Sequence, residues 1–194
     1  MIYMGDANWW NNRFSARSDK LMAHDSKLEA DMAVFPNHGT ALDIACGDGR
    51  NSIFLSKHGY SVDAVDFSET ALERLHSFAN AEKQIIHTKF IDLSNDSAFD
   101  ELKEYDLIII NHFRLNKSLY PDLLKHLKKD GYLWVNGFHE IPSNNPNVTN
   151  TDLLIDGDFE KITNCSLQNK ELYINGEHKL VRYIWKKNKV EGDQ

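Results

Sequence analysis

Cysteine and long apolar runs are both scarce in this sequence. Its 194 residues include only two cysteines, Cys46 and Cys165, which lie far apart and form no spacing typical of a metal site or a disulfide framework. No stretch approaches the roughly 18 consecutive apolar residues of a membrane-spanning helix, and the first residues lack the basic and apolar regions of a secretory signal. These absences predict a cytoplasmic protein with no metal site and no membrane association.

Positive charge is scarce as well. The chain carries 22 Lys and Arg against 29 Asp and Glu, a formal charge of -7. Nucleic acids and anionic lipids are bound by clustered basic side chains, so the balance favours a small-molecule partner and no nucleic acid. With 41% hydrophobic and 26% charged residues, the composition is that of one globular domain, either a monomer or a homodimer.

The order of predicted elements indicates the fold class. We predict strands at 40–45, 61–65, 85–91, 106–110 and 132–138, and helices at 50–58, 68–80 and 118–129. Further strands are predicted at 160–167, 171–174 and 178–185, the last two flanking the hairpin signal Asn175-Gly176. The predicted fold is therefore α/β, a Rossmann-like three-layer sandwich whose mostly parallel seven-stranded sheet has an antiparallel C-terminal hairpin.

A turn with two glycines, Asp43-Ile44-Ala45-Cys46-Gly47-Asp48-Gly49, follows the first predicted strand. The dinucleotide fingerprint G-x-G-x-x-G needs a third glycine, but Gly49 is followed by Arg50, Asn51 and Ser52. This makes an NAD oxidoreductase a distant alternative. No G-x-x-x-x-G-K-[ST] run occurs, so a phosphate-binding P-loop is excluded.

The same turn resembles motif I of the class I S-adenosylmethionine (SAM)-dependent methyltransferases, usually [D/E]-x-G-x-G-x-G, with Ala45 in place of the first glycine. The resemblance extends to Asp66, at the end of the second predicted strand, and to Asp92, after the third. The short chain, the Trp-Asn-x-Arg-Phe run at 10–14 and the antiparallel end are similar to the small-molecule branch, including tellurite-resistance-type and thiopurine-type enzymes.

The resemblance implies a methyltransferase that binds SAM and releases S-adenosylhomocysteine (SAH). It implies that Asp66 binds the ribose, that Phe67 packs on the adenine, and that Asp92 and Leu93 meet the adenine edge. Asn111, after the fourth predicted strand, would lie near the sulfonium. The implied cofactor residues of the turn and the helix after it are Asp43, Ala45, Cys46, Gly47, Gly49 and Asn51.

The implied acceptor side is less defined. His112 is the best-placed general base for a protonated acceptor, although an ordinary hydrogen-bonded histidine fits the same pattern. His139 follows the fifth predicted strand, at the sheet edge where ligands bind, and is otherwise a solvated loop residue. The N-terminal residues Trp9, Trp10, Arg13 and Phe14 would either cover the SAM site as a lid or pack as ordinary buried side chains.

The expected organisation is a helical extension or lid at 1–39, the SAM-binding domain at 40–186 and a polar tail at 187–194. Two alternative functions stay open. One is a SAM-binding module without catalysis. The other is a macromolecule methyltransferase, which the run Asn111-His112-Phe113-Arg114 disfavours because it lacks the [D/N]-P-P-[Y/F] pattern used on base amines.

Overall fold

The computed structural model describes residues 5–95 and 98–189. The chain divides into two compact units, Gly5–Ala98 and the part that begins at Phe99, called here the N-terminal and C-terminal units. Residues 1–4 of the predicted extension and 190–194 of the predicted tail lie outside the described residues. Lys187, where the tail was expected to begin, is still part of a strand.

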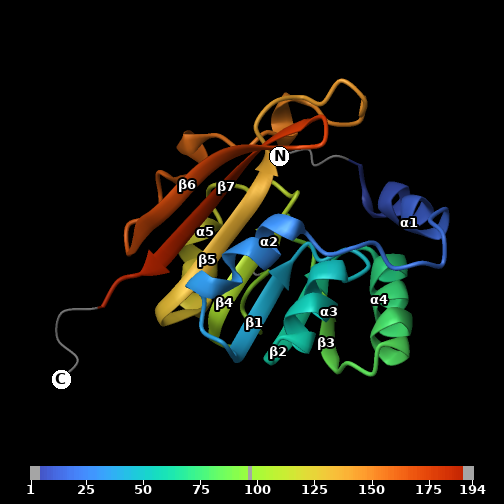
Figure 1. Ribbon diagram of the computed structural model, residues 1–194, viewed down its shortest axis with the longest axis horizontal. Coiled ribbons are helices and arrows are strands. Elements are labelled where there is room, and N and C mark those ends of the chain that lie inside the picture. Colours follow the sequence, from blue (N-terminus) through green and yellow to red (C-terminus); the bar gives the residue numbers. More distant parts are fainter. Residues whose placement is uncertain (1–4, 96–97, 190–194) are drawn as a thin grey trace. The chain divides into compact units, whose positions relative to one another are not determined.

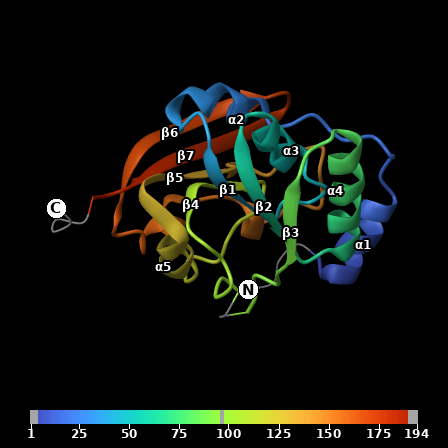
Figure 2. The ribbon, with the colours of Figure 1, turned by 90° about the horizontal axis from the view of Figure 1, so that it is seen from below.

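The N-terminal unit alternates strands with helices. Its elements are α1 (Ala7–Ser15), α2 (Ser26–Asp31), the 3-10 turn η1 (Met32–Val34), β1 (Gly39–Ile44), α3 (Arg50–Lys57), β2 (Tyr60–Asp66), α4 (Glu69–Ala81) and β3 (Ile86–Phe90). β2 pairs in parallel with β1 and with β3, and α3 and α4 run beside these strands (Figures 1 and 2). The predicted strands and helices of this region are confirmed to within one residue at each end.

Local sequence explains why these elements begin where they do. α3 starts directly after Gly49, whose left-handed backbone turns the chain out of the loop. α4 starts at the predicted cap, because the Ser68 hydroxyl accepts a hydrogen bond from the Ala71 N–H at 3.1 Å. Leu72 and Leu75 lie on the buried face of α4, and the side chains of β1 from Ala41 to Ile44 are buried, so helix and strand contribute to one core.

The C-terminal unit contains one parallel strand pair and one antiparallel hairpin. Its elements are β4 (Tyr105–Asn111), α5 (Tyr120–Leu123), η2 (Leu124–His126), β5 (Leu127–Phe138), η3 (Asn150–Asp152), η4 (Asp156–Phe159), β6 (Cys165–Asn175) and β7 (His178–Lys187). β4 pairs in parallel with β5, and β7 lies antiparallel between β5 and β6 (Figure 1). Leu107 to Ile110 are fully buried, as the continuous apolar run predicts.

The helix predicted at 118–129 is wrong in length. Only Tyr120–Leu123 is α-helical, and η2 leads at once into β5. Leu127, expected on the helix, instead pairs with Tyr105 of β4. Residues 128–131 then bulge out of the ladder, because the next pair joins Leu107 to Tyr132.

The strand predicted at 160–167 is also wrong, and the strand at 171–174 is too short. β6 is one strand that begins at Cys165, with an irregularity between Leu167 and Asn169. The predicted hairpin is confirmed, but its two-residue loop is Gly176-Glu177, because Asn175 pairs with His178. Gly176 has a φ of 59°, which suits the first position of a type II′ turn.

Taken along the sheet, the strand order is β3-β2-β1-β4-β5-β7-β6. This confirms the predicted seven-stranded, mostly parallel sheet with an antiparallel C-terminal hairpin. Among the helices of the described residues, none is long and apolar enough to cross a membrane.

Candidate functional site

Residues 45–49 form the tight turn between β1 and α3. Ala45, Gly47 and Gly49 have positive φ values of 55°, 56° and 84°. The turn is fixed to the next strand, since the Cys46 N–H donates to the Val65 carbonyl at 3.0 Å. Within the turn, the Gly49 N–H donates to the Cys46 carbonyl at 3.1 Å. Glycine adopts such angles at little cost, so the two glycines of the motif are explained by the backbone that the turn requires.

Gly49 also allows α4 to pack closely on the turn. A Cβ atom at Gly49 would lie 1.9 Å from Leu75 Cδ1 and 2.8 Å from Leu75 Cγ. Leu75 is fully buried, so its side chain has little room to move away. Position 49 therefore favours glycine for both packing and backbone reasons.

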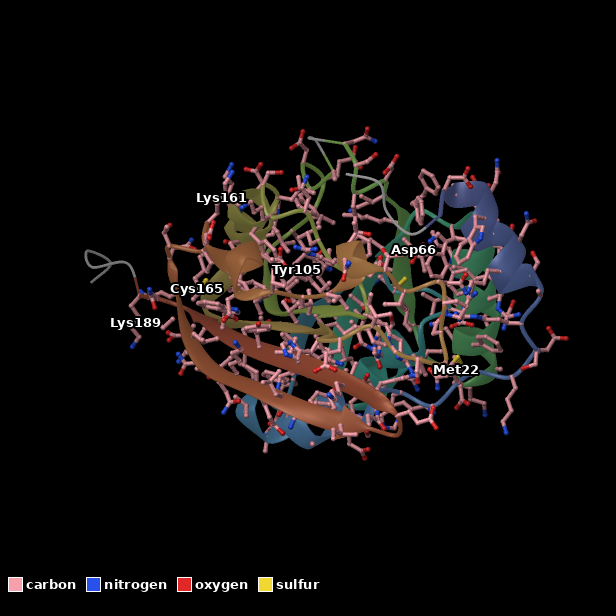
Figure 3. All side chains as sticks on the ribbon, turned by 90° about the horizontal axis from the view of Figure 1, so that it is seen from above. Met22, Asp66, Tyr105, Lys161, Cys165 and Lys189 are labelled. Carbon is pink, nitrogen blue, oxygen red and sulfur yellow. The ribbon has the colours of Figure 1, made fainter. Side chains whose placement is uncertain are left out.

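Asp66 ends β2 and holds the turn in place. One carboxylate oxygen accepts the Gly47 N–H at 2.8 Å, and the other accepts the Ser68 N–H at 2.9 Å. Burial raises the pKa of Asp66, and its hydrogen bonds from backbone N–H groups oppose that rise. Figure 3 labels this side chain. Asp66, the residue predicted to bind the ribose, thus also connects the turn to the start of α4.

Asp43 lies in β1, two residues before the turn begins, and is almost fully buried. Its carboxylate accepts the Ser52 hydroxyl of α3 at 2.6 Å. Desolvation raises the pKa of Asp43 to about 7, although the Ser52 hydrogen bond lowers it and the nearby Asp66 charge raises it further. Asp43 therefore ties β1 to α3 from within the core.

Helix α1 brings the predicted lid residues to this turn. Phe14 is buried, and its ring would lie 3.1 Å from a Cβ atom placed on Gly47. Trp9 and Trp10 are half-buried, while the exposed Arg13 guanidinium lies 5.2 Å from the Trp9 ring centre and 5.9 Å from that of Trp10. The four residues predicted as a lid thus lie on a helix that contacts the motif through Phe14.

Asn11 anchors α1 and was not predicted. Its Oδ1 accepts the Ser68 hydroxyl at 2.6 Å and the Thr70 N–H at 3.3 Å. The same Ser68 caps α4, and its N–H donates to Asp66 at 2.9 Å, so α1, α4 and the ribose-binding candidate share one hydrogen-bonded cluster. Asn11 lies in the Trp-Asn-x-Arg-Phe run, which was the only sequence signal for it.

A buried charge cluster connects the segment after α1 to the turn. Asp48 is 3% exposed, and its Oδ2 lies 3.2 Å from Arg17 Nη1 and 3.5 Å from Arg74 Nη2. The Arg17 guanidinium also lies 4.2 Å from the ring centre of Phe14. Sequence reasoning missed this cluster because Asp48 occupies a variable position of the motif pattern.

The remaining predicted cofactor residues of the N-terminal unit differ in surroundings. Asn51 is buried, and its side-chain oxygen accepts the Asp25 N–H at 2.9 Å. Asp92 accepts the Ser94 N–H at 2.9 Å in a local turn, with the buried Leu93 between them. Phe67 is half-buried, as is Cys46, whose pKa burial raises.

Asn111, His112 and His139 lie in the C-terminal unit. Asn111 Oδ1 accepts a hydrogen bond from Asn136 Nδ2 at 3.0 Å. His112 follows β4 with a φ of 53°, and its backbone N–H donates to the Asn136 carbonyl at 2.8 Å. The His112 ring centre is 5.2 Å from that of Phe138. His139 is exposed one residue beyond β5, so the structure brings Asn111 and His112 together and leaves His139 at the surface.

Comparisons with known proteins identify the family of this chain. The family model described as "Tellurite resistance protein TehB" matches residues 3–141. A probable SAM-dependent methyltransferase TehB of Haemophilus influenzae is 29% identical over 118 residues, which are 60% of this chain and 40% of that protein. A ribosomal protein L11 methyltransferase of Campylobacter concisus is 39% identical over 99 residues, which are 50% of this chain and 34% of that protein.

Solved structures add the fold. The crystal structure of TehB from Haemophilus influenzae matches with a TM-score of 0.67 and 20% identity over 92% of this chain and 67% of that one. The chain spans 34% to 40% of the length of the two curated relatives. The family match covers most of the chain and includes the turn, Asp66 and Asp92. The chain therefore belongs to the TehB family, a family of class I SAM-dependent methyltransferases.

Proposed function

We propose that this chain transfers the methyl group of SAM to an O, N or S atom of a small molecule and releases SAH. The observation that carries the proposal is the buried Asp66 carboxylate, held between the Gly47 and Ser68 N–H groups at 2.8 and 2.9 Å. A carboxylate has about four lone-pair sites, so Asp66 can hold the turn and still accept a ribose hydroxyl. The acid also ends a parallel strand, where ligands of α/β sheets bind.

The residues around the turn fit a SAM molecule. Gly47 and Gly49 carry no side chain, so a ligand can approach their backbone closely. Helix α1 contacts the same turn through Phe14, whose ring centre is 5.8 Å from that of Trp10. The half-buried rings of Trp9 and Trp10 can cover bound SAM and attract its cationic sulfonium. We infer that α1 is a lid that packs on the bound ligand and covers it.

For methyl transfer, the protein has to position the acceptor and, where the acceptor is protonated, remove its proton. Bound SAM supplies a methyl group that its sulfonium has already activated. Orientation of the acceptor can contribute about 7–11 kcal/mol to lowering the barrier. When the acceptor arrives as a hydroxyl or an ammonium group, the His112 imidazole removes its proton. The backbone hydrogen bond to Asn136 and the packing on Phe138 hold His112 for this role.

Calorimetric titration with SAM, SAH and NAD tests the cofactor. We expect SAM and SAH to bind and NAD not to bind. Asp66→Asn should weaken SAM by on the order of 10- to 100-fold, since it removes the charge that strengthens the ribose hydrogen bond. It also removes one of the two acceptors that hold the Gly47 and Ser68 N–H groups. Asp63→Asn is the matched control, because Asp63 is a buried acid of the same strand. Equal affinity in wild type and Asp66→Asn would refute the assigned ribose contact.

The acceptor is tested by methyl transfer from labelled SAM to a panel of small thiols, amines and phenols. The similarity to a ribosomal protein L11 methyltransferase supports one rival, a protein acceptor, so ribosomal proteins belong in the panel. Transfer to a small molecule, lost in His112→Ala with SAM affinity retained, is the expected result. SAM binding without transfer to any acceptor would favour the non-catalytic module.

A further inference from the structure

Asn136 lies at the centre of a hydrogen-bonded chain in the C-terminal unit. It is fully buried in β5, and its Nδ2 donates to Asn111 Oδ1 at 3.0 Å. Its own Oδ1 accepts the Tyr173 hydroxyl at 2.9 Å. Its backbone carbonyl accepts the His112 N–H at 2.8 Å. One residue therefore binds both candidate site residues at the end of β4.

Asn136 also belongs to a row of polar residues that runs across four strands. Asn136 is paired with Asn111 on one side and with Arg182 of β7 on the other, and Arg182 is paired with Glu171 of β6. Arg182 is 3% exposed and donates to Glu171 at 2.8 Å. Tyr173, two residues after Glu171, reaches across β7 to Asn136. Paired residues share one face of a sheet, so the row lies on one face of β4, β5, β7 and β6.

Within this row Asn136 and Arg182 are buried, and burying such polar side chains has a physical cost that apolar residues would avoid. A buried amide must have hydrogen-bond partners, and a chain of such bonds fixes the orientation of each member. The Tyr173 and Asn111 contacts together orient the Asn136 side chain, and this in turn sets the orientation of Asn111. The carbonyl of Asn136 meanwhile supports the unusual backbone of His112, whose φ is 53°.

We propose that Asn136 and Tyr173 are positioning residues that hold Asn111 and His112 in the orientation that methyl transfer requires. This inference rests on the proposed function, in which His112 removes the proton of the acceptor, and on the expectation that Asn111 lies near the sulfonium of bound SAM. Neither Asn136 nor Tyr173 needs to touch a ligand. Tyr173 acts on Asn111 through the Asn136 side chain, whereas the contact with His112 comes from the Asn136 backbone carbonyl, which a substitution at position 136 leaves in place.

The experiment uses Tyr173→Phe, which removes one hydroxyl and keeps the ring. The matched control is Tyr183→Phe, because Tyr183 lies on the neighbouring strand and its hydroxyl donates to Asp156 at 2.7 Å. NMR of the side-chain amides reports the state of Asn111, with its signals assigned by Asn111→Ala. Calorimetry with SAM reports the functional effect. Asn136→Ala is the second, larger change.

We expect Tyr173→Phe to shift the Asn111 amide signals and to weaken SAM about 3- to 10-fold, with Asn136→Ala at least as large and Tyr183→Phe unchanged in both. In a double-mutant cycle, Tyr173→Phe should have no further effect on SAM affinity once Asn111 is alanine. Wild-type SAM affinity in Tyr173→Phe, or additive effects in the cycle, would overturn the inference. Failure of the wild type to bind SAM would instead reject the proposed function. The NMR signals of the Asn111 amide would still show whether Tyr173 and Asn136 orient the Asn111 side chain.

Discussion

Ala45 adopts a backbone conformation that suits glycine. Its φ of 55° is left-handed, which costs an L-residue with a Cβ atom roughly 1–2 kcal/mol. We predict that Ala45→Gly raises the free energy of unfolding by about 0.5–1 kcal/mol, because relief of strain exceeds the added entropy of the unfolded chain. Urea denaturation measures it. Ala41→Gly, in the buried part of β1, should lower stability, and a loss in both variants would contradict the argument.

Asp43 gives the protein a pH dependence of known sign. Its pKa of about 7 in the folded state lies above the ordinary value of 3.8, so the folded protein binds more protons than the unfolded chain between these values. The stabilising contribution is thus fully present below about pH 4 and is lost as the pH rises through 7.

We predict that the difference in unfolding free energy between Asp43→Asn and wild type changes in favour of the variant by on the order of a few kcal/mol when the pH is raised from 5 to 8. The reason is that the asparagine stays neutral at both pH values. Urea denaturation of both proteins at the two pH values measures the difference. The Ser52 hydroxyl can still donate to the asparagine oxygen, so the variant should fold. A difference that does not change with pH would show that Asp43 keeps an ordinary pKa.

At the scale of elements, the packing of α4 on the turn depends on one missing side chain. Gly49→Ala combines a φ of 84° with a Cβ atom 1.9 Å from Leu75 Cδ1, and we predict a loss of about 2–4 kcal/mol in unfolding free energy. Gly176→Ala separates the two effects, since its φ is 59° but no atom lies within 4 Å. It should lose about 1–2 kcal/mol from strain alone. Thermal unfolding compares them, and equal losses would remove the packing argument.

The elements of the N-terminal unit could be predicted because each has a local signal. A glycine turn, the Ser68 cap and an acid at a strand end mark boundaries within a few residues of sequence. The helix predicted at 118–129 failed because its leucines at 119, 123, 124 and 127 are all buried, as a helix would require, yet the last belongs to β5. The spacing of apolar residues indicates which side chains are buried, but the pairing of Leu127 with Tyr105 gives the backbone at Leu127 its extended conformation.

The candidate site follows the same division. The turn, Asp66 and Asp92 were predicted because the sequence there resembles the motifs of a known family. Three residues of this region were missed from the sequence because each contacts a partner that is distant in sequence and near only in the folded chain: Asn136, Tyr173 and Asn11. Tyr173 is 37 residues from Asn136, and Asn11 is 57 residues from Ser68. Their assignment to the site, like the predicted domain boundaries and cytoplasmic location, stays a prediction.

For the whole molecule, ligand binding should appear as stability. A ligand that binds only the folded state at 100 times its dissociation constant adds about 2.7 kcal/mol to the free energy of unfolding. We predict this gain for SAM and for SAH, and no gain for NAD. Thermal unfolding over a range of SAM concentrations measures it. Asp66→Asn should lose about half of the gain or more at the same SAM concentration, and an equal gain in variant and wild type would place SAM elsewhere.

The position of β7 between β5 and β6 has a consequence for synthesis. The ribosome makes β6 before β7, yet β6 reaches the sheet only through β7. Until residues 178–187 have emerged, the backbone groups of β5 that face β7 have no strand beside them, and Trp134 and Val135 lie along that open edge. Open apolar edges recruit other chains, so we expect a nascent chain stalled before His178 to aggregate more readily than the complete chain. Once β7 has emerged, the β6–β7 hairpin can form rapidly because its turn closes over two residues, and β7 can then dock on β5 with β6 already paired to it.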